Sequence, residues 1–228
     1  MSPPDARVSE TAKIYGVVLS VGICCSLAIV TTYEVTRPII QRNRISQRND
    51  AIREILPSAS SVAMFRLNER GNQFQVESSE ATGPDLIFAG FDSQGTLVGI
   101  AIETSGMGYQ DRIRLLYAYS TERQAITGTR VLESRETPGL GDRIESDNDF
   151  LSNFDSLDVS LDSNGTDLAH PIEFVKPGKR TSRWQIDGIT GATISSRAIA
   201  EMLRDSAADW IPRVHARQAD FVSPVTRN

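Results

Sequence analysis

The chain has 228 residues, 23% of them charged, and a formal net charge of −5 at pH 7. This negative balance argues against nucleic acid as a partner, because phosphate backbones bind faces rich in Lys and Arg. The two cysteines, Cys24 and Cys25, are adjacent, and only two histidines are present. That pattern fits neither a metal site nor a disulfide framework. We therefore expect no metal site, and any redox chemistry would need an organic cofactor.

The chain begins with an apolar stretch that is long enough to span a membrane. Residues 14–33 carry no charge and are bracketed by Tyr15 and Tyr33, as interfacial aromatic residues bracket membrane spans. About 20 helical residues at roughly 1.5 Å each span a hydrocarbon core of about 30 Å. A cleavable signal peptide is the alternative, but the run is long for one and no clear cleavage site follows. We predict a short tail over 1–13 and a single transmembrane helix over 14–33.

The next segment predicts a helical stalk over residues 34–57. Ile45, Ile52, Ile55 and Leu56 recur at helical spacing, and Pro57 ends the pattern. This segment also carries more basic residues than the N-terminal side of the apolar stretch, which would place the large domain in the cytoplasm. Long domains often override flanking charge, so the bias does not decide the orientation. The arginines in this segment are Arg37, Arg42, Arg44, Arg48 and Arg53.

Short segments of β-type composition follow from residue 58, separated by turn signals such as Ser93-Gln94-Gly95. Strands joined by such short turns indicate an antiparallel meander. We predict an α+β domain over 58–212, in which helices flank an antiparallel sheet, and a C-terminal tail over 213–228. A short helix over 149–154 should bury Phe150 and Phe154. The predicted strands cover 64–67, 72–76, 85–91, 96–103, 113–120, 125–132, 171–175 and 184–186.

Two glycine-rich loops stand out within this domain. Gly106-Met107-Gly108-Tyr109 puts an aromatic residue beside two glycines, and Glu136-Thr137-Pro138-Gly139-Leu140-Gly141-Asp142 follows the last strand of the meander. Such loops can hold their backbone flat against a planar ligand, although an exposed turn is the favoured interpretation of either loop alone. The acidic segment 162–167 lacks the ligand spacing of an EF-hand and indicates a tight turn.

A third glycine-containing motif precedes a helical pattern near the end of the domain. Asp187-Gly188-Ile189-Thr190-Gly191-Ala192-Thr193-Ile194-Ser195-Ser196 combines two glycines with four hydroxyl side chains. Glycine lets the backbone approach a ligand, and the first turn of a helix offers unpaired N–H groups to a phosphate. The alternative is an ordinary turn in which Thr190 or Thr193 caps the helix. The motif alone leaves both interpretations open.

Two motifs together resemble a known family. Asp187–Thr193 is similar to the D-x-[ILV]-[ST]-G-A-T signature of covalent FMN-binding domains, and Glu136–Gly141 resembles their ETPGLG element. With the N-terminal anchor, the chain resembles the G subunits of Rnf electron-transport complexes over nearly its whole length. The resemblance implies FMN esterified through its phosphate to the Thr193 hydroxyl by a flavin transferase that uses FAD and magnesium. It assigns to the cofactor Thr193, Thr190, Gly191, Ala192, Ser195, Ser196, Asp187, Glu136, Thr137, Pro138, Gly139, Leu140 and, more weakly, Tyr109.

The resemblance also implies a role and a location. The chain would relay electrons within a ferredoxin:NAD oxidoreductase complex that is coupled to Na⁺ or H⁺ translocation. Its partners would be the membrane and iron–sulfur subunits of that complex. It would lie in a bacterial inner membrane as a single-pass protein with a periplasmic flavin domain. No base, nucleophile or nicotinamide fingerprint is evident, so we expect no catalytic residue and no independent turnover.

Two other functions compete with this interpretation. The C subunit of the sodium-translocating NADH:quinone oxidoreductase has the same cofactor chemistry, although the chain length and Ile194-Ser195-Ser196 favour the Rnf family. A flavin-free, membrane-anchored sensor or interaction domain is the second alternative. In that case Thr193 would be a simple helix cap.

Overall fold

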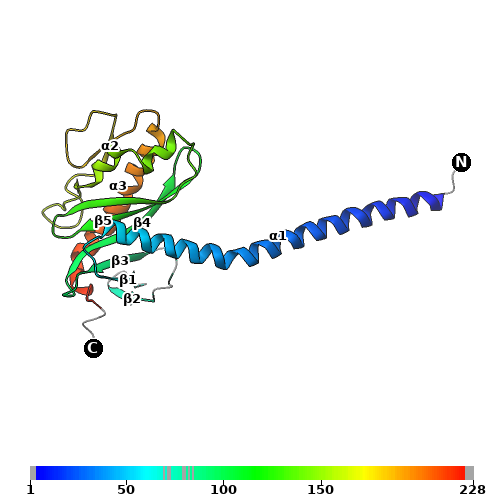
Figure 1. Cartoon of the computed structure of the whole chain (residues 1–228), viewed down its shortest axis with the longest axis horizontal. Helices are drawn as coiled ribbons and strands as arrows, with labels where there is room; N and C mark the ends of the chain where they lie inside the picture. The colour runs from blue at the N-terminus through cyan, green and yellow to red at the C-terminus, as the bar shows by residue number, and fades with distance from the viewer. Residues whose placement is uncertain are drawn as a thin grey trace. The chain divides into compact units, whose positions relative to one another are not determined.

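The computed structural model describes residues 4–68, 70, 73–78, 81, 83 and 85–223, with side chains from residue 13 onward. The chain divides into two compact units, Met1–Ser46 and Gln47–Asn228. Helix α1 (Pro4–Ile55) runs from the first unit into the second (Figure 1). The predicted tail, transmembrane helix and stalk thus fall mainly on one unbroken helix. Residues 1–3 of the predicted tail lie outside the described residues.

The first unit consists of the N-terminal part of α1. By length and composition this helix can cross a membrane, and its most apolar window has no buried residue within the described structure. Exposed side chains include Ile14, Leu19, Ile23 and Val30. A continuous apolar helix surface of this kind is unfavourable in water and favourable in lipid. The helix therefore fits a membrane anchor.

An antiparallel sheet is the frame of the second unit. Among the described residues it has seven strands in the order β2-β1-β3-β4-β5-β6-β7. Successive strands from β3 to β6 pair with one another, which confirms the predicted α+β class with a meander. Strand β2 pairs with β1 at the edge instead of lying between β1 and β3. The strands are β1 (Ser61–Leu67), β2 (Phe74–Glu77), β3 (Leu86–Phe91), β4 (Leu97–Met107), β5 (Arg112–Ser120), β6 (Ala125–Glu133) and β7 (Leu157–Asp158).

Both faces of the sheet are covered. Helix α3 (Thr193–Ala216) packs on one face (Figure 1), where Ile199 and Leu203 join the main hydrophobic core. The last turns of α1 lie on the other face, where Ile52 and Leu56 pack in a second cluster with Phe88. A strand between two covered faces is apolar along its whole length, and every residue of β3 is buried accordingly.

Smaller elements fill the long connection between β6 and α3. As predicted, a short helical segment buries Phe150 and Phe154, whose rings meet edge to face at 5.2 Å. The strands β8 and β9, which lead into the glycine-containing motif at 187–196, form a separate parallel pair. These elements are η1 (Gly141–Glu145), α2 (Asn148–Leu151), η2 (Ser152–Phe154), β8 (Glu173–Val175) and β9 (Gln185–Asp187), and η3 (Gln218–Asp220) follows α3.

The predicted start of a C-terminal tail at residue 213 is wrong. Helix α3 continues through Pro212 to Ala216, and Phe221 packs edge to face on Phe65 at 5.1 Å. An interior proline costs about 3 kcal/mol, while each large apolar side chain that is fully buried returns roughly 1.5–3 kcal/mol. Burial of Ile211 and Val214 therefore outweighs the cost of the proline. Residues 224–228 lie outside the described part of the chain.

We predict that Leu203→Ala lowers the free energy of unfolding by about 2–5 kcal/mol, because it opens a cavity at a fully buried site between α3 and the sheet. The matched control is Asp205→Ala, on the exposed side of the same helix, which should change stability by less than about 0.5 kcal/mol. Denaturant unfolding of the detergent-solubilised chain, followed by circular dichroism, measures both. Equal losses in the two variants would contradict the packing described above.

Candidate functional site

The motif 187–196 forms the connection from β9 into α3. Ile189 and Ala192 are buried and anchor the loop to the core, whereas Thr190, Gly191 and Thr193 are exposed. Thr193 is the first residue of α3. The loop is thus anchored to the core by its buried residues, and it presents a threonine hydroxyl to solvent at the start of a 24-residue helix.

The N-terminus of α3 lacks a side-chain cap. Its N-cap residue is Ala192, which makes no side-chain hydrogen bond, and the first turn, all of it described, contains no acidic residue. A Ser, Thr or Asp at this position typically stabilises a helix by about 1 kcal/mol relative to Ala. Thr193 lies one residue past the cap, so the structure does not support the alternative of a simple capping threonine. The N–H groups of the first turn and the positive end of the helix dipole are available to an anion.

Ser195 and Ser196 use their hydroxyl groups within the protein. The Ser196 hydroxyl donates to the Ala192 carbonyl at 2.9 Å and accepts from the Ile189 N–H at 3.3 Å. The Ser195 hydroxyl donates to the carboxylate of Glu136. Both side chains are buried, and these contacts favour a structural role over the predicted contact with the cofactor.

Two further residues of the motif have structural roles within the fold. The Asp187 carboxylate accepts from the N–H groups of Gly178 and Lys179 at 2.9 and 3.2 Å, which fixes the turn between β8 and β9. A Cβ at Gly188 would lie 2.6 Å from the ring of Phe174, so only glycine fits there. Asp187 thus points toward a neighbouring turn within the fold.

Glu136 connects the second glycine-rich loop to its surroundings. Its side chain is only 6% exposed. The N–H groups of Tyr109, Gln110 and Asp111 donate to its carboxylate at 3.2, 3.0 and 3.5 Å, and the Ser195 hydroxyl is a fourth donor. Burial alone would raise the pKa of Glu136, but these hydrogen bonds bring the pKa below its ordinary value. The group is therefore a buried carboxylate anion at neutral pH.

Two glycines make room for this carboxylate. A Cβ at Gly108 would lie 2.4 Å from Glu136 Oε1, and one at Gly141 would lie 2.7 Å from Oε2. Any other residue at either position would displace the Glu136 side chain. The glycines that suggested a flat ligand-binding loop therefore serve, at these two positions, to admit the carboxylate.

The remaining residues of the second loop face outward. Pro138, Gly139 and Leu140 are exposed, while the Thr137 hydroxyl donates to the side-chain oxygen of Gln110 at 3.1 Å. Leu140 is 51% exposed, and its Cδ2 atom lies 3.7 Å from the position of a Cβ on Gly191. This loop therefore lies beside the motif, as a cofactor shared by the two would require.

The segments around this junction also carry exposed apolar side chains. Tyr109 and Met107 come from the β4–β5 hairpin and are 65% and 64% exposed, and Ile194 follows Thr193 and is 54% exposed. Ile194 lies in the first turn of α3, where its side chain is directed to solvent. These residues and Leu140 come from the three segments that Glu136 connects.

Sequence reasoning missed two arginines at the site. Arg143, one residue beyond the second loop, donates to the Thr190 carbonyl at 2.9 Å and pairs with Asp147. Arg197 lies one helical turn after Thr193 and holds its guanidinium 5.0 Å from the centre of the Phe174 ring. Residues four apart share a helix face, and that spacing was the available signal for Arg197. Both cations are close enough to the motif to favour an anion there.

Comparisons with known proteins agree with this geometry. The sequence model of the FMN-binding domain family matches residues 108–208, a range that includes every segment of the site. The G subunit of the ion-translocating oxidoreductase complex of Methanosarcina acetivorans is 30% identical over 213 residues, covering 90% of this chain and 97% of that protein. The corresponding G subunit of Pasteurella multocida is 31% identical and covers 90% of this chain and 98% of its own length.

Two solved structures share this fold. The C subunit of the Na⁺-translocating NADH-quinone reductase from Parabacteroides distasonis has a TM-score of 0.60 and 19% identity, over 77% of this chain and 94% of that chain. NqrC from Shewanella oneidensis has a TM-score of 0.53 and 19% identity, over 82% and 96%. These two proteins share the fold, whereas the sequence relationship over almost the whole length is to the G subunits. The chain therefore belongs to the family of G subunits of ion-translocating oxidoreductase complexes.

Proposed function

We propose that this chain is a membrane-anchored flavoprotein subunit that carries FMN on Thr193 and relays electrons within an Rnf-type complex. The observation that carries the proposal is the position of Thr193. Its exposed side chain stands at the start of α3, which lacks a side-chain cap, beside the exposed loop 138–140. Family membership and the FMN-binding domain match support the choice of cofactor.

The start of α3 suits a phosphodiester. A phosphate esterified to Thr193 keeps one negative charge, and a charge at a helix N-terminus is stabilised by roughly 0.3–2 kcal/mol. Arg197, one turn along the same face, would add a second favourable interaction. These contributions orient the phosphate but are too small to retain a cofactor. The ester bond to Thr193 would supply the retention.

The exposed part of the second loop suits the isoalloxazine ring. Pro138, Gly139 and Leu140 leave backbone and one apolar side chain available, and Tyr109 stands exposed on the neighbouring hairpin. The side chains of Glu136 and Thr137 already have protein partners. Contacts to the ring would therefore come from Leu140, Tyr109 and the loop backbone.

The protein's part in electron transfer would be to bind, orient and electrostatically tune the flavin, which supplies the redox chemistry. Within the described residues, no cluster of three or more His, Cys, Asp or Glu side chains could hold a metal ion. Electrons would therefore pass between this flavin and cofactors of neighbouring membrane and iron–sulfur subunits. The complex would couple ferredoxin:NAD oxidoreduction to Na⁺ or H⁺ translocation.

Attachment would require a flavin transferase that acts on the folded surface. The hydroxyl-bearing side chains of Thr190 and Thr193 are exposed, whereas those of Ser195 and Ser196 are buried. Exposure therefore limits the accessible acceptors in the motif to two threonines. Thr193 is favoured because it alone belongs to the first turn of α3.

We predict that Thr193→Val, which has nearly the same shape but no hydroxyl, abolishes covalent flavin while the fold is retained. The chain is co-expressed with an active flavin transferase, denatured on a gel and examined for flavin fluorescence, with intact mass as a second readout. Thr190→Val is the matched control, since it removes another exposed hydroxyl three residues earlier and should leave the band fluorescent. A fluorescent Thr193→Val band would refute attachment at this residue.

We further propose a single membrane span over 14–33 with the flavin domain on the periplasmic side. The arginine bias after the span opposes this orientation, but it is weaker than a simple count suggests. Arg48 is buried in the folded unit, with its guanidinium 4.7 Å from the centre of the Phe88 ring. Its role is in packing, and long domains can override the flanking charges that are left.

Alkaline phosphatase fused after Asn228 should therefore be active in intact bacteria, because this reporter folds only where its disulfides form. The same fusion without residues 1–46 should be inactive, since it lacks the apolar helix. Green fluorescent protein at the same position provides the reciprocal test. Bright fluorescence together with an inactive phosphatase would place the domain in the cytoplasm.

A further inference from the structure

The Glu136 carboxylate joins three segments that are distant in the sequence. It accepts hydrogen bonds from the turn after β4, through Tyr109, Gln110 and Asp111, and from the first turn of α3, through Ser195. Glu136 itself begins the second loop. Every segment that contributes to the proposed flavin site is therefore attached to this one side chain.

These contacts leave the carboxylate little capacity for a ligand. Each oxygen already accepts at least one hydrogen bond, and the side chain is almost completely buried. Gly108 and Gly141 approach it so closely that no additional atom fits at either position. The predicted direct contact between Glu136 and the flavin is therefore disfavoured, and a different role has to account for the buried charge.

All four donors to Glu136 are neutral groups, namely three backbone N–H groups and one hydroxyl. Two other charged side chains around the junction have ionic partners. Asp111 pairs with Arg135 at 3.4 Å, and Arg143 pairs with Asp147. Neutral donors stabilise an anion without cancelling its charge. The negative charge of Glu136 therefore acts on its surroundings more strongly than that of an ion-paired carboxylate.

We infer that Glu136 is a positioning residue that holds the 109–111 turn, the 137–140 loop and the start of α3 in register and fixes a negative charge beside the flavin. This inference rests on the proposed attachment of FMN to Thr193. The charge opposes reduction, because reduction adds negative charge to the ring. It therefore keeps the midpoint potential of the flavin lower than it would be beside a neutral residue.

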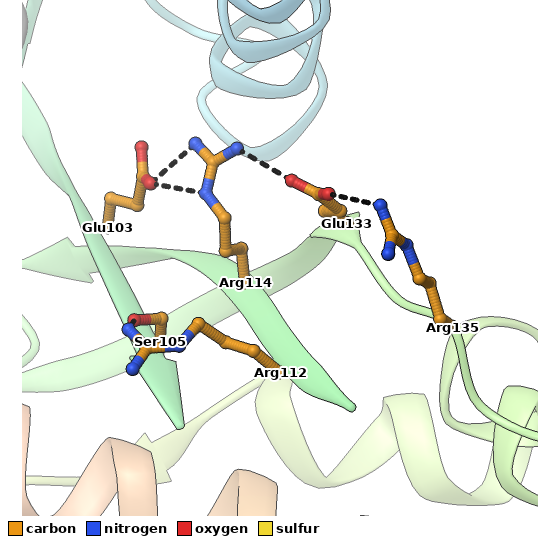
Figure 2. Close-up of polar contacts among 6 residues, drawn as sticks. All are labelled: Glu103, Ser105, Arg112, Arg114, Glu133 and Arg135. Atoms are coloured by element: carbon orange, nitrogen blue, oxygen red, sulfur yellow. Dashed lines mark hydrogen bonds and ion pairs between the residues drawn. The ribbon is translucent and has the colours of Figure 1, made fainter. Parts of the chain in front are cut away.

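The test compares Glu136→Gln, which removes the charge at constant size, with Glu136→Asp, which keeps the charge but shortens the reach to the donors. The matched control is Glu133→Gln. Glu133 lies three residues earlier, but its charge is paired with Arg114 and Arg135, at 3.2 and 3.9 Å (Figure 2). Each full-length variant is made with the flavin transferase, and covalent fluorescence, the midpoint potential and visible circular dichroism of the flavin are measured.

We expect Glu136→Gln to be labelled, to shift the midpoint potential to more positive values and to lose most of the visible circular dichroism. Glu136→Asp should lose circular dichroism with a smaller shift in potential, because its charge remains. Glu133→Gln should match the wild type in both. Absence of label on the wild-type chain would instead overturn the proposed function, so the two failures are distinguishable.

Two results would overturn the positioning role. One is a folded, labelled Glu136→Gln protein with wild-type potential and circular dichroism. The other is a folded Glu136→Gln protein that is not labelled, which would place Glu136 in the attachment step itself. If Glu136→Gln does not fold, Ser195→Ala decides, because it removes one donor and leaves the charge. Reduced visible circular dichroism in that variant supports the inference, and an unchanged signal contradicts it.

Discussion

The buried carboxylate of Glu136 is the constraint on which the candidate site depends. An ionised carboxylate removed from water is costly unless hydrogen bonds replace its hydration. Here the turn after β4 and the first turn of α3 supply those bonds. If either segment moved away, the buried carboxylate would lose hydrogen bonds and the folded state would be destabilised. Gly108 and Gly141 are the corresponding steric requirement. The site is therefore preorganised by the protein, and the loop 138–140 and Thr193 keep a defined separation.

The sheet and α3 provide the stability that this arrangement needs. Both faces of the sheet are packed, by α3 on one side and by the end of α1 on the other. On the sheet face that the end of α1 covers, Arg114 bridges Glu103 and Glu133 (Figure 2). Against that background, the fold tolerates an N-terminus of α3 without a capping side chain, at a cost of about 1 kcal/mol. Locally unfavourable features, such as a helix N-terminus without a capping side chain, are concentrated at functional sites.

Local patterns predicted much of this molecule. Turn residues and β-type composition placed the strands of the meander, and two motifs identified the loops around Thr193. The contacts that hold those loops were beyond sequence reasoning, because Glu136 meets its donors across 25 to 59 residues of chain. Ser195 and Ser196 were assigned to the cofactor because the sequence does not reveal their burial against Glu136 and Ala192, which depends on tertiary packing. The C-terminal tail was predicted to begin after Pro212 for the same reason, since only the core shows that burial of Ile211 and Val214 compensates for a proline inside the helix.

The central claim is that the exposed hydroxyl at the first residue of α3 carries the flavin. Trypsin should release residues 184–197 as one peptide, because the chain has Arg183 before it and Arg197 at its end. This peptide contains all four hydroxyl side chains of the motif, so tandem mass spectrometry of the flavin-labelled protein can distinguish them. We expect a mass increase of FMN less one water, with fragment ions that assign it to Thr193. An unmodified peptide, or an adduct on Thr190, Ser195 or Ser196, would contradict it.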